Sequence, residues 1–220
     1  MSPPTTRLED GKPAGYWVEL IGLAASRAEV AVSFQILPYA RALREVSDGT
    51  NRCNPLVART ADREESYSWI APTRRLLISA FVLRGATDPP RTAEALKQRE
   101  IAVMRGTLGD LTLTALGIPA RRVVDTDQMA LLLERGRVSV IVSDFQVAMA
   151  AAGTAAIAIE EVVRLSETPG YFACSPDLDA AAGQRLTIEI DAIFTKGEDR
   201  ALAAANGLGD SYEAVRPAPR

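Results

Sequence analysis

Hydrophobic residues in the first quarter of the chain follow two different spacings. In residues 15–28, GYWVELIGLAASRA, they recur with the 3.6-residue period of a helix packed on a core, and this stripe consists of Trp17, Leu20, Ile21 and Ala24. Residues 30–37, VAVSFQIL, are rich in β-branched and apolar residues, which predicts a strand. A helix over residues 39–49 and a strand over 53–58 follow. This alternation predicts a largely parallel sheet covered by helices.

A second alternating series follows a strand over residues 75–85 and a proline-rich break at 86–92, ATDPPRT. Its predicted strands are 100–106, 121–125, 138–144 and 156–165, and its predicted helices are 92–98, 107–117, 126–136 and 145–153. A Pro-Gly break and a short returning strand are expected within residues 166–177. The proline-rich break therefore suggests a boundary between two lobes.

The last part of the chain contains one ambiguous segment. Residues 186–194, LTIEIDAIF, alternate like a strand, but their apolar residues also fall at helical spacing. We expect a helix there and mainly helix up to Gly207. Residues 211–220, SYEAVRPAPR, are expected to form a solvated tail.

Composition excludes several functional classes. With 47% hydrophobic residues, the 220-residue chain can bury a substantial core. Its 25 basic and 28 acidic residues leave a net charge of −3, so nucleic acid and anionic membranes are not expected partners. The chain has no histidine and no clustered carboxylates, so we expect no metal and no cofactor. Its longest apolar run is too short to cross a bilayer.

Three short stretches contain candidate binding groups. Thr60 and Arg63 follow the predicted strand 53–58, and a guanidinium can grip a carboxylate through two hydrogen bonds. The alternative is a capped helix in which Arg63 pairs with a neighbouring glutamate. Gly106 with Thr107, and Asp144, also end strands, where each can equally cap the following helix.

Six stretches in this order resemble the extracellular solute-binding proteins of family 3, the amino-acid-type periplasmic binding proteins of ABC transporters. They are DGKPAGYWVEL, PYARALREVSDG, RTADREESYSWIAP, IAVMRGT, LLLERGRVSVIVSD and YFACSPD. The resemblance implies an α/β type II periplasmic-binding fold with two lobes joined by two crossing strands. Lobe one would comprise residues 1–83 and 172–220, and lobe two residues 84–171.

The resemblance also implies roles for the candidate residues. Arg63 would bind the ligand's α-carboxylate, and Asp144 would face its ammonium group. The other expected ligand contacts are Thr60, Ala58, Gly106, Thr107 and Tyr16. Ala58 stands where many family members have a hydroxyl residue, so one carboxylate contact is expected to be lost. Whether Arg59 faces the ligand stays open.

The resemblance changes the expectation for the two cysteines. From the residues alone, Cys53 and Cys174 could be buried free thiols, because they lie far apart and lack C-x-x-C spacing. In the family, the strands that carry them lie side by side, which predicts a disulfide in an exported protein. The chain begins without an export signal, and the resemblance implies that one was removed from a periplasmic protein.

Family members begin with a strand that this sequence lacks. A monomer is expected, but the missing strand leaves a strand-exchanged dimer open. The implied function is capture of an amino acid or a similar small polar solute for an ABC permease in the membrane, without catalytic residues. A cyclohexadienyl-dehydratase-like enzyme and a ligand-sensing domain are the alternatives on the same fold.

Overall fold

The computed structural model describes residues 5–209 and 211–217. The chain divides into two compact units. Unit 1 comprises Met1–Arg75 and Pro169–Arg220, and unit 2 comprises Leu76–Thr168. Strands β4 (Ser68–Leu83) and β8 (Ile159–Cys174) contribute residues to both units. The division therefore falls within these two strands, whereas the sequence suggested the proline-rich segment that follows β4.

Unit 1 contains the two ends of the chain. Its elements before β4 are β1 (Arg7–Glu9), β2 (Lys12–Ala14), α1 (Tyr16–Arg27), α2 (Tyr39–Ser47), β3 (Cys53–Ala58) and the 3₁₀ helix η1 (Ala61–Ser66). After β8 it adds α7 (Ala180–Lys196), α8 (Glu198–Ala205) and α9 (Ser211–Val215). The antiparallel hairpin β1–β2 was not expected from the sequence.

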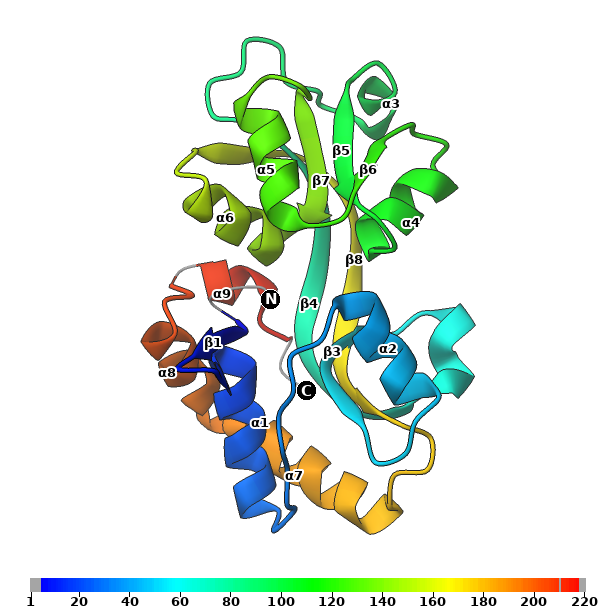
Figure 1. Ribbon diagram of the computed structural model, residues 1–220, viewed down its shortest axis with the longest axis vertical. Helices are drawn as coiled ribbons and strands as arrows, with labels where there is room; N and C mark the ends of the chain where they lie inside the picture. The colour runs from blue at the N-terminus through cyan, green and yellow to red at the C-terminus, as the bar shows by residue number, and fades with distance from the viewer. Residues whose placement is uncertain (1–4, 210, 218–220) are drawn as a thin grey trace. The chain divides into compact units, whose positions relative to one another are not determined.

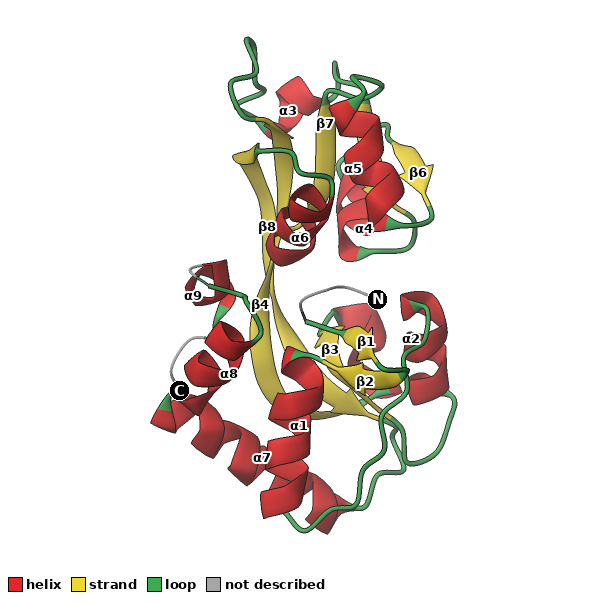
Figure 2. Ribbon diagram, turned by 60° about the vertical axis from the view of Figure 1, so that its left-hand side comes forward, coloured by secondary structure: helices red, strands yellow, loops and turns green. Residues whose placement is uncertain are grey.

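Helices α1 and α7 pack together in the core of unit 1, as Figure 2 shows. The stripe predicted for α1 is buried, with Leu20 and Ala24 at 0% exposure. Across from it, α7 buries Leu186, Ile190 and Ile193 in the same cluster. The ambiguous segment 186–194 is therefore helical, as expected, because helical spacing gathers its apolar side chains on the face toward α1.

The C-terminal end of unit 1 is folded where the sequence suggested a solvated tail. In α9, Tyr212 is 2% exposed and Val215 is fully buried. The Tyr212 hydroxyl lies 2.7 Å from the Tyr16 hydroxyl and donates to Asp199 Oδ2 at 2.7 Å. Arg216 Nε donates to the same carboxylate oxygen at 2.6 Å. One buried carboxylate on α8 thus holds residues of the described part of this segment, 211–217, whereas residues 218–220 lie outside the described residues.

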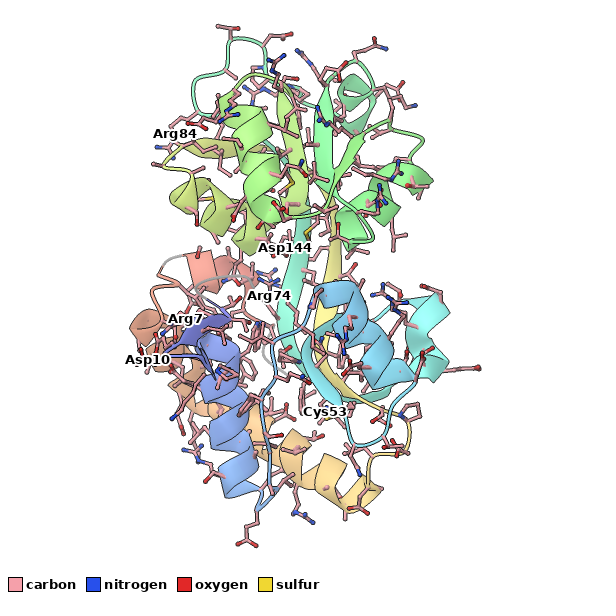
Figure 3. All side chains as sticks on the ribbon, in the orientation of Figure 1. Arg7, Asp10, Cys53, Arg74, Arg84 and Asp144 are labelled. Carbon is pink, nitrogen blue, oxygen red and sulfur yellow. A yellow bond between two sulfur atoms is a disulfide. The ribbon has the colours of Figure 1, made fainter. Side chains whose placement is uncertain are left out.

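Strand β3 pairs antiparallel with β8 in unit 1, and a disulfide joins them. Cys53 lies opposite Cys174, with 2.04 Å between the sulfurs and 121 residues between the positions. Figure 3 labels Cys53 on β3. The predicted disulfide is confirmed. Pairing of the two strands brings together cysteines that lie far apart in the sequence.

In unit 2 the neighbouring strands follow the order β8, β4, β7, β5 and β6, of which β8 and β4 continue into unit 1. After β4 its elements are α3 (Ala93–Leu96), β5 (Ile101–Met104), α4 (Leu108–Ala115), β6 (Arg121–Val123), α5 (Thr126–Glu134), β7 (Val140–Asp144) and α6 (Phe145–Thr154). Figure 1 shows α4, α5 and α6 beside these strands. Val103, Val140 and Val142 are fully buried between sheet and helices, as the strand pattern predicted.

Three expectations about strands were wrong. The sheet is not largely parallel: β5 pairs parallel with β6 and with β7, but β3–β8 and β4–β7 are antiparallel. Residues 30–37 belong to no strand. The Pro169-Gly170 pair does not break β8, because the carbonyl of Pro169 still accepts a hydrogen bond from the Arg59 N–H at 3.2 Å.

Candidate functional site

Arg63 lies on η1, directly after β3, in unit 1. Its side chain is partly exposed, and among the described residues it forms no ion pair. Of the two neighbouring glutamates considered in the capped-helix alternative, Glu64 and Glu65, Glu64 pairs with Arg59 instead. The guanidinium of Arg63 therefore keeps its capacity to bind a carboxylate in two hydrogen bonds.

Tyr39, the first residue of α2, forms a side-chain hydrogen bond with Arg63. Loss of solvent around the Tyr39 hydroxyl raises its pKa, while Arg63, which hydrogen-bonds to it, and Arg74 lower it through their positive charge. The backbone N–H groups at the start of α2 add a further positive end, because Pro38 provides no side-chain cap. This corner of unit 1 thus favours an anion.

Thr60 and Ala58 lie on the same segment as Arg63. Thr60 takes the N-cap position of η1, but its side chain makes no cap hydrogen bond. The nearby Thr60 hydroxyl lowers the pKa of the Asp62 carboxyl, but the buried Thr60 Oγ1 makes no hydrogen bond of ordinary geometry among the described residues. Ala58 is 1% exposed at the end of β3, opposite Gly170. Of this pair, only Thr60 brings a polar side chain to the segment.

Arg59 is occupied by a different set of contacts. It forms an ion pair with Glu64, and its guanidinium carbon lies 5.4 Å from the Trp69 ring and 5.1 Å from the Tyr171 ring. The ion pair raises the pKa of Arg59 further. Ion pairing and cation–π contacts already engage this guanidinium, so Arg59 stabilises the surface of unit 1 through them.

Tyr16 was expected to contact the ligand, but its side chain belongs to the core of unit 1. It is 1% exposed, bonded to Tyr212, and packed edge-on against Trp17 at 4.8 Å between ring centroids. Burial raises the pKa of its hydroxyl far above the ordinary value. Tyr39, 39% exposed, is an aromatic residue that hydrogen-bonds to Arg63. Tyr67 also lies close to Arg63: loss of solvent raises the pKa of its hydroxyl, and the charge of Arg63 lowers it.

In unit 2, Asp144 ends β7 and begins α6. It is 9% exposed, and its Oδ2 accepts a hydrogen bond from the Leu77 N–H at 3.2 Å. Its side chain makes no hydrogen bond to the first turn of α6, so the N-cap interpretation of this residue has no support. A carboxylate held at the carboxyl end of a strand is in the position where α/β sheets bind ligands.

Gly106 and Thr107 form the N-terminal cap of α4. The Thr107 hydroxyl accepts from the Asp110 N–H at 3.4 Å and donates to the Met104 carbonyl at 2.7 Å. The Gly106 N–H donates to Asp110 Oδ2 at 3.0 Å. Both residues therefore use their polar groups inside unit 2, as the capping alternative requires.

Gly106 provides a stability prediction, because its φ of 73° lies in the left-handed region. An added Cβ would meet no atom within 4 Å, so Gly106→Ala should cost only the backbone strain of an L residue in the left-handed region, about 1 kcal/mol of unfolding free energy. Gly153→Ala is the matched control: that glycine is also uncrowded but helical, and the change should stabilise by about 0.5–1 kcal/mol. Urea unfolding of both variants measures the difference; equal signs would contradict the argument.

Solved structures share this fold over nearly the whole chain. A histidine kinase sensor domain with similarity to periplasmic binding proteins matches with a TM-score of 0.83 and 19% identity, covering 98% of this chain and 94% of that one. A solute receptor for L-cysteine of Neisseria gonorrhoeae matches with a TM-score of 0.78 and 18% identity, covering 99% and 92%. A putative L-cystine ABC transporter from Listeria monocytogenes reaches 0.78 and 20%, covering 96% and 93%.

The chain has the periplasmic-binding-protein fold. The α/β fold implied by the resemblance is thereby confirmed. No family model and no curated protein matches the sequence. At 18–20% identity the likeness is one of fold, and the ligand has to be argued from the side chains.

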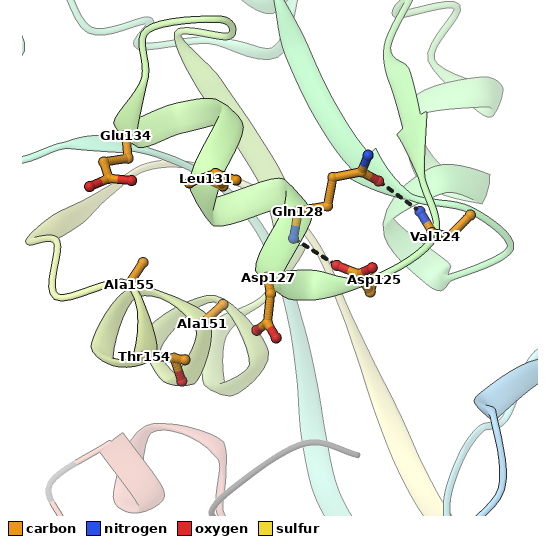
Figure 4. A pocket seen from close by; sticks show the side chains of 9 residues that line it. All are labelled: Val124, Asp125, Asp127, Gln128, Leu131, Glu134, Ala151, Thr154 and Ala155. Carbon is orange, nitrogen blue, oxygen red and sulfur yellow. Dashed lines mark hydrogen bonds between the residues drawn. The ribbon is translucent and has the colours of Figure 1, made fainter.

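A groove within unit 2 has a composition different from that of an amino-acid site. Figure 4 shows it between α5 and α6. Its volume is about 480 Å³. Asp125, Asp127 and Glu134 line it together with Leu131 and small residues of α6. Its carboxylates would repel the carboxylate of an amino acid, so the corner around Arg63 remains the candidate site of this periplasmic-binding fold.

Two further features were not found among the described residues, a metal-ligand cluster and a membrane-spanning helix. These residues contain no group of three or more His, Cys, Asp or Glu side chains that could hold a metal ion. None of their helices combines the length and apolar character needed to cross a bilayer.

Proposed function

We propose that this protein is a periplasmic solute-binding protein that captures an amino acid, or a similar small solute with a carboxylate, for uptake by an ABC transporter. The observation that carries the proposal is Arg63, which has no ion-pair partner among the described residues and adjoins Tyr39 and the start of α2. Solved structures of the same fold include a receptor for L-cysteine and a putative L-cystine transporter.

In this proposal the Arg63 guanidinium binds the carboxylate, and Thr60 and the Tyr39 hydroxyl offer further hydrogen bonds. Asp144 of unit 2 binds the ammonium group, because a shielded carboxylate selects for a cation. Gly106 and Thr107 hold the first turn of α4. The bound ligand would stabilise the conformation that binds it best, without a chemical step.

A periplasmic location follows from the same proposal. The disulfide between Cys53 and Cys174 is typical of an oxidising compartment. A sensory role is the second candidate, since the histidine kinase sensor domain matches with a TM-score of 0.83 over 98% of this chain. In that role the same ligand would be bound, and the difference would lie in the receiving partner.

Arg63→Ala tests the site. Purified protein is screened by thermal shift against the common amino acids, opines, polyamines and organic acids, and the ligand found is titrated by calorimetry. Loss of a bidentate charged pair should weaken binding by about 3 kcal/mol, roughly a hundredfold in Kd. Arg59→Ala is the control, because Arg59 carries the same charge four residues away but is paired with Glu64.

Asp144→Asn separates the two ends of the ligand. It should weaken an amino acid strongly and a simple carboxylic acid little, because only the amino acid has an ammonium group. If Arg63→Ala and Arg59→Ala bind the ligand equally well, the assignment of Arg63 is wrong. If no compound in the screen raises the melting temperature, the amino-acid proposal itself fails.

A further inference from the structure

Residues 31–37, AVSFQIL, lie in the segment that connects α1 and α2 in unit 1 (Figure 1). These seven residues make no hydrogen bond with any described residue. The residues just beyond their two ends do form backbone hydrogen bonds. The Val30 N–H still donates to Ala25, and the Pro38 carbonyl accepts from Arg41 and Ala42. Between these ends, seven consecutive residues keep their backbone donors and acceptors unpaired within the described chain.

This connecting segment has the composition of a strand. Its pattern is β-branched, aromatic and apolar, and it contains neither a charged residue nor a proline. Val32 is 45% exposed and Phe34 37%. Proteins normally protect a free strand edge with lysine, proline or a bulge. None of these devices is present in residues 31–37, so the segment is available for pairing.

The strands of unit 1 do not use this segment. The hydrogen-bonded order begins with β3, and among the described residues its one neighbouring strand is β8. Phe34 is held instead by α1, where its ring lies 3.9 Å from the position that a Cβ on Gly22 would occupy. Val30 also packs on the core around α1. The segment is thus positioned by side-chain packing, while its backbone lacks a partner among the described residues.

We propose that residues 31–37 pair antiparallel with the same residues of a second copy of this chain, forming a two-fold symmetric dimer. A second copy is the occupant that the sequence favours, because antiparallel pairing centred on Phe34 is self-complementary. In that register Val32 lies opposite Ile36 of the second copy, Phe34 opposite Phe34, and Ser33 opposite Gln35. On one face all the facing residues are apolar, whereas the other face pairs Ser33 with Gln35 in the middle and Ala31 with Leu37 at its ends.

The absence of charge and the unpaired backbone groups of residues 31–37 both favour a second copy of the chain as the partner. Like charges opposite each other destabilise a strand pair, and residues 31–37 avoid this in a self-pair because they carry no charge. The pairing would satisfy backbone groups that have no partner within the described chain and would cover Val32 and Phe34. It does not involve Arg63 or Asp144, so it is independent of the proposed function.

Sedimentation equilibrium of the full chain, from low to high micromolar concentration, tests the proposal. We expect a reversible monomer–dimer equilibrium. Hydrogen exchange should show amides of residues 31–37 slowing as the concentration rises. A protein that stays monomeric throughout this range overturns the proposal, as does a dimer in which these amides exchange at the monomer rate.

Three variants identify the surface. Ser33→Pro removes one backbone N–H that makes no hydrogen bond in the monomer, and Val32→Lys with Phe34→Lys introduces facing charges. Both should reduce association at least tenfold. Ile188→Lys, on α7 of the same unit and 57% exposed, is the matched control and should dimerise like the parent. Equal dimerisation of all three variants would place the interface elsewhere.

Phe34→Cys tests the register. The central residue of a two-fold antiparallel pair faces its own copy at roughly 4.5–5.5 Å between Cα atoms, close enough for a disulfide between chains. A covalent dimer should form on oxidation and disappear on reduction. Val32→Cys should not cross-link, since its expected neighbour is Ile36. Cross-linking of Val32→Cys alone would contradict the Phe34-centred register.

Discussion

Replacing Asp199 by alanine is expected to lower the unfolding free energy by about 3–5 kcal/mol, because it leaves a largely covered arginine without its counter-ion. The Asp199 carboxylate is fully buried and receives hydrogen bonds from Tyr212 and from Arg216, whose side chain is 14% exposed. Burial raises the pKa of the Tyr212 hydroxyl, and the hydrogen bond to Asp199 raises it further. Tyr212 thus stays neutral and donates its proton to the carboxylate.

The neighbouring ion pair between Arg200 and Glu213 provides the control. It joins the same two helices, but its side chains are 53% and 54% exposed. Glu213→Ala should therefore cost less than about 1 kcal/mol. Urea unfolding of both variants measures the two losses. Near-equal losses would show that the buried carboxylate does not hold α9 in place.

Loss of the disulfide is expected to have the other large effect, about 4–5 kcal/mol in the chain-entropy account, because it closes a long loop in the unfolded chain. The bridge joins positions 121 residues apart. Cys53→Ala with Cys174→Ala should therefore unfold at much lower urea concentration than the parent. Alanine is chosen because Cys174 is fully buried and alanine keeps that position apolar.

Reduction of the parent protein tests the same effect without a substitution. The reduced parent should unfold at nearly the same urea concentration as the double variant, since both lack the link in the unfolded state. If the oxidised parent and the double variant differ by less than about 1 kcal/mol, the disulfide contributes little to stability.

Much of the candidate site could be predicted from residue types and their order. Arg63 follows β3 as its T-x-x-R spacing suggested, and Asp144 ends β7 as expected. The sequence could not show that Tyr16 faces the core while Tyr39 faces Arg63, because that choice depends on packing against α9 and η1. The signal for Tyr39 was its place at the start of a helix, where an anion is favoured.

The expected strand at residues 30–37 shows a different limit. Its composition favours a strand, and the backbone remains unpaired because strand formation needs a neighbour. The C-terminal residues show the converse: their composition suggested a solvated tail, yet Asp199 and Tyr16 supply partners that order Tyr212 and Arg216.

The sequence by itself determined the elements whose periodicity is strong, above all α1, α7 and the buried strands of unit 2, since a repeated apolar face can be satisfied only against a core. Tertiary structure alone decided which strands pair parallel, that β8 continues through Pro169, and where α9 ends. These features depend on partners distant along the chain. Local residue patterns carry no information about a buried carboxylate or a neighbouring strand until folding brings them together.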